Sequence, residues 1–206
     1  MSKNETNTNI TLTFPDGNKK EFVKGITGID LAKSISKSLE KKAIAIKADE
    51  KYLDLVDEIP SSAKIEIITV DTDIGLDIMR HTIAAQVLAK AIKKLFPDSK
   101  LAIGPTIENG FYYDVLFKKP ISIEDLPKIE QEMKSIISSG SSIKKILVSK
   151  KEAIKLFNER EEIYKVDIIK ESNQKDNFQI YSQNNTEFID LCYGPHLPSL
   201  KFIGAF

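Results

Sequence analysis

The stretch LAIGPTIENGFYYD, residues 101–114, decides the fold class of the larger part of this sequence. Gly104-Pro105 and Asn109-Gly110 are turn dipeptides, and the apolar residues around them predict short strands joined by turns. The preceding residues 76–96 carry apolar side chains at four-residue steps, which predicts a long helix that ends before Pro97. The combination of this helix with short strands predicts an α+β unit.

The same unit extends to the end of the chain. Residues 124–138 predict a second helix, because they begin with acidic residues and continue with apolar residues at helical spacing. Further on, the patterns predict a helix at 151–159 and strands at 143–148, 164–169, 178–181 and 188–191. We therefore expect one α+β domain over residues 76–206.

A smaller unit precedes it. Ile10, Leu12 and Phe14 alternate with threonines, and Pro15-Asp16-Gly17 predicts a hairpin turn after them. An amphipathic helix and two further alternating stretches follow, so residues 10–70 have the β-β-α-β-β order of a small β-grasp, ubiquitin-like domain. We expect residues 1–9 to be a disordered tail and residues 71–75 to be a linker.

Composition excludes several classes of protein. The 206 residues include 30 Lys+Arg and 30 Asp+Glu, so a generic polyanion-binding protein is not expected and contact with nucleic acid should be local and shape-specific. A single cysteine cannot form an internal disulfide, which favours a reducing compartment. No apolar run has the length of a membrane span. We expect a cytoplasmic protein with no membrane partner.

The rare residues point to the larger unit. Cys192 and His196 form a Cys-x3-His motif just beyond a predicted strand, and His81 on the long helix is the natural distant partner. Such residues can be metal ligands, or a thiol with a base. They can equally be structural residues of a turn and a helix, and the spacing alone does not decide between these alternatives.

Four blocks of residues together resemble one family. Arg80-His81-Thr82, residues 101–114, Tyr164-Lys165-Val166 and residues 190–196 (DLCYGPH) resemble bacterial threonyl-tRNA synthetases, in that order and at that spacing. The resemblance covers the N-terminal region of the family enzyme only. It implies that the first unit is a TGS domain, and that the second is an editing domain related to that of alanyl-tRNA synthetases. The chain ends within a segment that resembles the family's continuing chain, so this domain is expected to be truncated at its C-terminus.

The resemblance also implies a reaction. The family's editing domain hydrolyses mischarged Ser-tRNA(Thr), because a pocket that selects threonine discriminates against the smaller serine by only about 1–3 kcal/mol. By similarity, His81, Cys192 and His196 are catalytic residues in the editing site. Lys165 and Asp190 would position the ester and the attacking water, while Gly104 and Tyr113 would shape the pocket for the aminoacyl end of the tRNA.

The helix departs from the family pattern. The family carries His-x3-His there, but the residue four after His81 is Ala85, and there is one extra residue before Val87. Counted back from Val87, the two histidine positions become Thr82 and Gln86. Periodicity favours this second register, which places Thr82 and Gln86 on the substrate side and turns His81 away by about 100°, unless a π-bulge absorbs the extra residue. A zinc site of His81, Cys192 and His196 would require the less favoured register, so no metal is expected.

Two other functions stay open. The domain could be a catalytically inactive appendage that binds the tRNA acceptor arm, or a freestanding trans-editing hydrolase. No cofactor is expected in this fragment, since the resemblance assigns ATP and a zinc ion to the family's catalytic domain, which is absent here. The family enzyme is a homodimer through that domain, so the fragment is expected to be a monomer with tRNA(Thr) and Ser-tRNA(Thr) as its partners.

Overall fold

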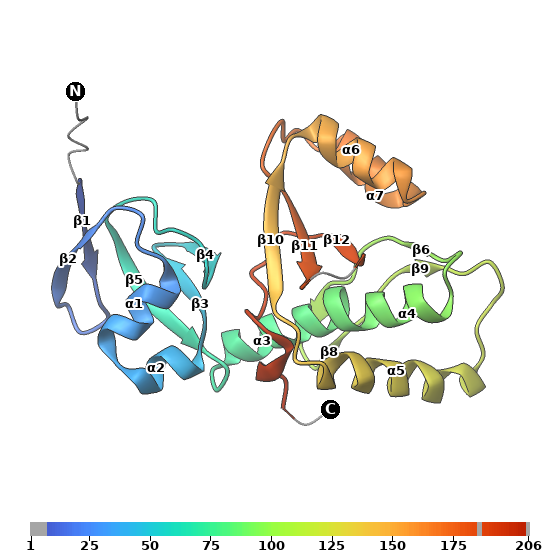
Figure 1. Ribbon diagram of the computed structural model, residues 1–206, viewed down its shortest axis with the longest axis horizontal. Coiled ribbons are helices and arrows are strands. Elements are labelled where there is room, and N and C mark those ends of the chain that lie inside the picture. Colours follow the sequence, from blue (N-terminus) through green and yellow to red (C-terminus); the bar gives the residue numbers. More distant parts are fainter. Residues whose placement is uncertain (1–7, 185–186, 205–206) are drawn as a thin grey trace. The chain divides into compact units, whose positions relative to one another are not determined.

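The chain forms two compact units, which the computed structural model describes for residues 8–184 and 187–204 (Figure 1). The first unit comprises the residues up to Leu76 together with Pro195–Pro198, and the second comprises Asp77–Gly194 and the residues from Ser199. Residues 1–7 of the predicted tail lie outside the described residues, and β1 already begins at Asn9. Among the described residues, no helix has both the length and the apolar character needed to span a bilayer.

The first unit is a five-stranded sheet with the order β2-β1-β5-β3-β4, packed against two short helices. Its central pair β1·β5 is parallel and its other pairs are antiparallel. In chain order, the elements are β1 (Asn9–Thr13), β2 (Lys19–Val23), α1 (Gly28–Ile35), α2 (Lys37–Lys42), β3 (Ala43–Ala48), β4 (Lys51–Asp54) and β5 (Ala63–Thr69). The buried side chains of Ile10 and Leu12 confirm the predicted alternation of the first strand.

Two details of this unit were not predicted from the sequence. The single predicted helix is interrupted at Ser36, whose hydroxyl accepts a hydrogen bond from the Leu39 N–H at 3.1 Å and so begins α2. The short strand β4 was also missed. Asp54, its last residue, is buried, and its Oδ1 accepts a hydrogen bond from the backbone N–H of His196 at 2.8 Å. Pro195–Pro198 is therefore part of the first unit, although it lies far along the sequence.

The second unit combines helices with small sheets, as expected. Its antiparallel sheet has the order β10-β11-β12, and two two-stranded ladders, β6·β9 and β7·β8, accompany it. The helices are α3 (Asp73–Thr82), a π-helix (Ile83–Leu88), α4 (Ala89–Leu95), α5 (Leu126–Ser138), α6 (Lys150–Glu159) and α7 (Ile163–Glu171), with 3-10 turns at Ile123–Asp125 and Leu200–Phe202. The strands are β6 (Lys100–Leu101), β7 (Thr106–Ile107), β8 (Gly110–Phe111), β9 (Val115–Leu116), β10 (Ile143–Val148), β11 (Phe178–Gln183) and β12 (Ile189–Leu191).

One predicted strand is wrong. Residues 164–169 belong to α7, which packs against α6 as the second arm of a helical hairpin (Figure 1). The β-branched residues of this stretch suggested a strand, but Val166 and Ile169 are three residues apart and are both buried in the cluster that contains Phe157 of α6. Burial on one helical face therefore outweighs the local β preference.

The long predicted helix is present, but it is not α-helical throughout. Ile83–Leu88 forms a π-helix, in which the N–H of Ala89 bonds to the carbonyl of Ala84 five residues back. A π segment contains one residue more than an α-helix of the same rise, so it accommodates an insertion without rotating the flanking turns. The extra residue noted in the sequence is absorbed here.

A buried ion pair joins three elements of the second unit. Glu162 precedes α7, and its Oε1 lies 2.7 Å from Lys93 Nζ of α4, while its Oε2 accepts a hydrogen bond from the Leu101 N–H of β6 at 3.0 Å. Lys93 also donates to the carbonyls of Pro97 and Ser99. Both carboxylate oxygens are therefore used, and the position of α7 is tied to that of the long helix.

We expect Glu162→Ala to lower the free energy of unfolding by about 1–3 kcal/mol, because it leaves the buried Leu101 N–H without an acceptor and removes the carboxylate that pairs with Lys93. Urea denaturation of the whole chain measures this loss. Glu159→Ala removes an exposed ion pair with Lys155 and should change stability by no more than about 1 kcal/mol. Equal effects of the two substitutions would show that the buried pair does not hold these elements together.

Candidate functional site

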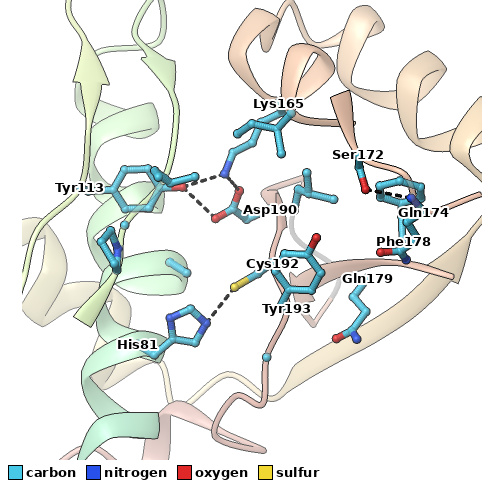
Figure 2. Close-up of a pocket in the computed structure, with 17 residues that line it drawn as sticks. His81, Tyr113, Lys165, Ser172, Gln174, Phe178, Gln179, Asp190, Cys192 and Tyr193 are labelled. Carbon is cyan, nitrogen blue, oxygen red and sulfur yellow. Dashed lines mark hydrogen bonds and ion pairs between the residues drawn. The ribbon is translucent and has the colours of Figure 1, made fainter. Parts of the chain in front are cut away.

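The second unit contains a pocket of about 320 Å³ at the centre of the predicted site (Figure 2). Its walls come from the long helix, the loop after β6, α7, β11, and the end of β12. The predicted site residues that line it are His81, Gly104, Tyr113, Lys165, Asp190 and Cys192. The tertiary structure thus brings together residues that are spread over more than a hundred positions of the sequence.

Two buried charged groups and one tyrosine hydroxyl form one wall. Lys165 Nζ lies 2.8 Å from Asp190 Oδ1, and both side chains are almost fully excluded from solvent. Lys165 also donates to the Tyr113 hydroxyl at 3.0 Å, and that hydroxyl donates to Asp190 Oδ2 at 3.0 Å. The three groups close a ring of one ion pair and two hydrogen bonds, which Figure 2 shows as dashed lines.

The electrostatics of this ring follow from its burial. Burial raises the pKa of Asp190, although Lys165 and the hydrogen bonds act in the opposite direction. Burial, and then the charge of Asp190, raise the pKa of Tyr113 well above its ordinary value, so the phenol stays protonated and remains a donor. The Lys165 ammonium has three N–H groups, of which the described residues accept two. The third can serve a ligand.

Gly104 makes room for the Tyr113 ring. A Cβ atom at Gly104 would lie 2.3 Å from Cδ2 of Tyr113, a distance that packed atoms do not tolerate. The ring could not keep its place beside Lys165 and Asp190 if residue 104 had a side chain. Gly104 is therefore a packing requirement of the ring that Lys165, Asp190 and Tyr113 form.

We expect Gly104→Ala to displace Tyr113 and to lower the free energy of unfolding by about 1–3 kcal/mol. Gly110→Ala is the matched control, because a Cβ atom there would meet no atom within 4 Å. Urea denaturation compares their stability, and the side-chain NMR signals of Tyr113 report its displacement. Unchanged Tyr113 signals in Gly104→Ala would contradict the packing argument.

The opposite wall carries the thiol and the imidazole. Cys192 Sγ lies 2.8 Å from Nε2 of His81, and Figure 2 shows the two side chains pointing toward each other. Cys192 follows β12, and its N–H donates to the Gln179 carbonyl of β11 at 3.2 Å. Gly194 then turns the chain with φ +61°, where a Cβ atom would lie 2.1 Å from the Tyr181 hydroxyl. Only glycine fits this turn, which fixes the position of Cys192.

The thiol is not a nucleophile at neutral pH. Burial, and then the charge of Asp190, raise the pKa of Cys192 to about 12. Because the thiolate is the nucleophilic form, a protonated Cys192 cannot attack an ester. It can hold the imidazole of His81 in place through their hydrogen bond.

We expect iodoacetamide to alkylate Cys192 in the folded chain at pH 8 at least about a hundredfold more slowly than in the chain unfolded in urea. The chain has one cysteine, so mass spectrometry measures this reaction directly. Equal rates in the folded and unfolded chains would contradict a raised pKa of the Cys192 thiol.

The same shift predicts a pH dependence of stability. The thiol ionises near 9 in the unfolded chain and at about 12 in the folded one, so the folded state keeps a proton that the unfolded state has lost. Stability should therefore fall as pH rises from 9 to 12, and Cys192→Ala should lack this component of the decline.

The register of the long helix differs from the one that periodicity favours. His81 and Ala85 line the pocket, whereas Thr82 and Gln86 are not among its lining residues. Thr82 donates its hydroxyl proton to the Ile78 carbonyl at 2.8 Å, and Gln86 is completely buried, with no hydrogen-bond partner for its amide among the described residues. The expectation that these two residues face the pocket is wrong, because the π-helix absorbs the extra residue after His81.

His196 is described with the first unit, and it is buried there within Pro195–Pro198. It is not among the residues that line the pocket. Of the three zinc ligands considered, His81 and Cys192 line the pocket.

Several lining residues were not predicted. Three of them lie within the blocks that carry the resemblance but were not singled out: Ile103, Pro105 and Tyr193. The others lie outside those blocks, so no motif in the sequence identifies them: Ile168, Ser172, Gln174, Phe178 and Gln179. Tyr193 is 74% exposed. Figure 2 shows Ser172, Gln174, Phe178 and Gln179 on the side of the pocket away from His81. Only the fold shows that these side chains share a cavity.

Comparison with known proteins agrees with this architecture. Residues 10–69 match the TGS domain, and residues 178–206 match the family described as threonyl and alanyl tRNA synthetase second additional domain. The chain carries a TGS domain and a region of the second additional domain found in threonyl and alanyl tRNA synthetases. It is 45% identical over 195 residues to the threonine–tRNA ligase of Bartonella bacilliformis and 47% identical over 197 residues to that of Anoxybacillus flavithermus.

These matches cover nearly all of this chain but only part of each relative. They cover 95% and 96% of this chain, but 29% and 30% of the two ligases. The chain thus spans about a third of the length of these curated relatives.

Proposed function

We propose that this chain acts in a threonine–tRNA ligase as the module that removes serine from mischarged tRNA(Thr). The observation that carries the proposal is the pairing of His81 with a protonated Cys192 in a pocket whose wall holds the buried Lys165–Asp190–Tyr113 ring. An ester bound between these groups would meet a base and a cationic donor at the same time. This arrangement suits acyl transfer to water.

The proposed chemistry is direct hydrolysis. His81 accepts a proton from a water molecule as its oxygen bonds to the ester carbon, and the remaining N–H of Lys165 stabilises the oxyanion. The bond between the carbon and the ribose oxygen then breaks, and the proton passes to that oxygen. The products are serine and deacylated tRNA. Cys192 contributes by holding the imidazole, since its raised pKa excludes a thiolate nucleophile.

The substrate follows from the limits of selection by size. A synthetic site that accepts threonine also admits serine, which lacks one methyl group, at a cost of only about 1–3 kcal/mol. A second site that rejects the methyl group removes the error. Aminoacylation with ATP, a zinc ion in a catalytic domain, homodimerisation and binding of tRNA(Thr) belong to the same proposal for the whole enzyme.

One observation favours a second candidate function. The pocket holds Ala85 four residues after His81, so the long helix presents a single imidazole to it. If one imidazole is insufficient for hydrolysis, the domain would bind the acceptor arm of the tRNA without catalysis. Deacylation assays separate the two functions.

We expect the chain to hydrolyse Ser-tRNA(Thr) at least about tenfold faster than Thr-tRNA(Thr), and His81→Ala to reduce the rate constant for the serine ester by about 10²–10⁴. Release of labelled amino acid measures both rates, with a chelator present in a parallel series to test for a metal. Gly110→Ala serves as the control outside the pocket and should retain the rate.

Two results would separate the candidates. Serine-selective hydrolysis that depends on His81 supports the editing function. Binding of tRNA(Thr) by the folded chain, with no hydrolysis above the uncatalysed rate, would overturn it in favour of the binding function.

A further inference from the structure

The π-helix is held from the side by one buried amide. Gln183, the last residue of β11, is completely buried. Its Nε2 donates a hydrogen bond to the backbone carbonyl of Gln86, and its Oε1 accepts one from Lys90 Nζ at 2.9 Å. Both halves of the amide are therefore used on residues one turn apart, one within the π-helix and one just beyond it. Gln183 belongs to none of the sequence blocks that suggested the site.

The position of the π segment decides which side chain enters the pocket. The helix has one residue too many, and the segment that absorbs it could lie on either side of His81. If the π turn moved to the N-terminal side, residue 81 would rotate by about 100° and leave the pocket, and Thr82 would approach it instead. The observed π segment begins at Ile83. It directly follows His81 and Thr82, the two residues that would exchange places at the pocket.

The strand that carries Gln183 also positions the thiol. The Gln179 carbonyl of β11 accepts the N–H of Cys192, and Tyr181 of β11 is paired in register with Asp190 of β12. One strand thus holds the Cys192 segment at one end and the π-helix at the other. Both partners of the His81–Cys192 contact are placed relative to β11.

We propose that Gln183 is a positioning residue, whose amide holds the π turn C-terminal to His81 and thereby keeps the imidazole on Cys192. Gln183 acts through the helix and touches neither partner of that contact. The statement concerns the geometry of the site, and only its kinetic consequence rests on the proposed hydrolysis.

NMR spectroscopy of the whole chain tests the geometry. The chain has two histidines, so ¹⁵N-histidine labelling gives one ring for His81 and one for His196 as an internal reference. In the wild type, Cys192→Ala should shift the His81 ring nitrogens. The leucine side chain of Gln183→Leu neither donates nor accepts a hydrogen bond. In this variant, Cys192→Ala should leave the chemical shifts of the His81 ring nitrogens nearly unchanged. Gln131→Leu, on an exposed position of α5, is the matched control and should preserve the response.

A rescue experiment distinguishes positioning from general stability. Deletion of one alanine of the Ala84-Ala85 pair removes the extra residue, so the helix can run as an α-helix with both ends in their present orientation. In this background, Gln183→Leu should no longer abolish the response of His81 to Cys192→Ala. Failure of the deletion to restore it would overturn the proposal, as would a Gln183→Leu chain that keeps the full response.

A second variant, Gln183→Glu, tests the proposal if Gln183→Leu fails to fold. Gln183→Glu keeps the size of the side chain and an acceptor for Lys90, but it loses the donor to the Gln86 carbonyl. It should weaken the His81 response while the chain stays folded, and an unchanged response would contradict the proposal. If hydrolysis is active, both variants should lower its rate constant by about tenfold to a hundredfold. If the wild type hydrolyses no ester, the proposed function fails, but the NMR response still decides the role of Gln183.

Discussion

Placing an ammonium group and a carboxylate side by side out of water is the constraint on which the second unit depends. Lys165 and Asp190 come from a helix and a strand, and neither charge could be buried alone without a cost of several kcal/mol. Their pairing therefore requires α7 and β12 to stay together. The Tyr113 hydroxyl accepts a hydrogen bond from Lys165 and donates one to Asp190. Two other features support this pair. Gly104 has no side chain and so leaves room for the Tyr113 ring, and Glu162 anchors the start of α7 to Lys93.

The ring also sets the chemistry of its neighbours. The charge of Asp190 and the exclusion of water keep the Cys192 thiol protonated, which assigns the reactive role to the imidazole. A site of this kind combines an imidazole on one side with an ammonium N–H group on the other. It can polarise an ester carbonyl without forming a covalent intermediate with the protein.

The insertion in the long helix shows how a local irregularity can preserve a distant contact. An α-helix with the same residues would turn His81 away from Cys192, whereas the π segment keeps the flanking turns in place. The π segment has a cost in stability, because the buried side-chain amide of Gln86 has no hydrogen-bond partner among the described residues. Gln183 offsets part of this cost by bonding to the backbone of the π segment.

The sequence by itself determined the two domains, the α+β class and a minority of the residues that line the pocket, among them His81, Lys165 and Cys192. Alternating and four-residue patterns are local, and the blocks around Gly104, Lys165 and Cys192 keep their spacing along the chain. It did not determine that residues 164–169 are helical, because burial against Phe157 outweighs the preference of a short β-branched run. The tertiary structure alone decided the helix register and the partners of His81. One residue of slip changes no pattern that the sequence can display, but it moves a side chain by about 100°, and only the contacts from β11 select between the two positions.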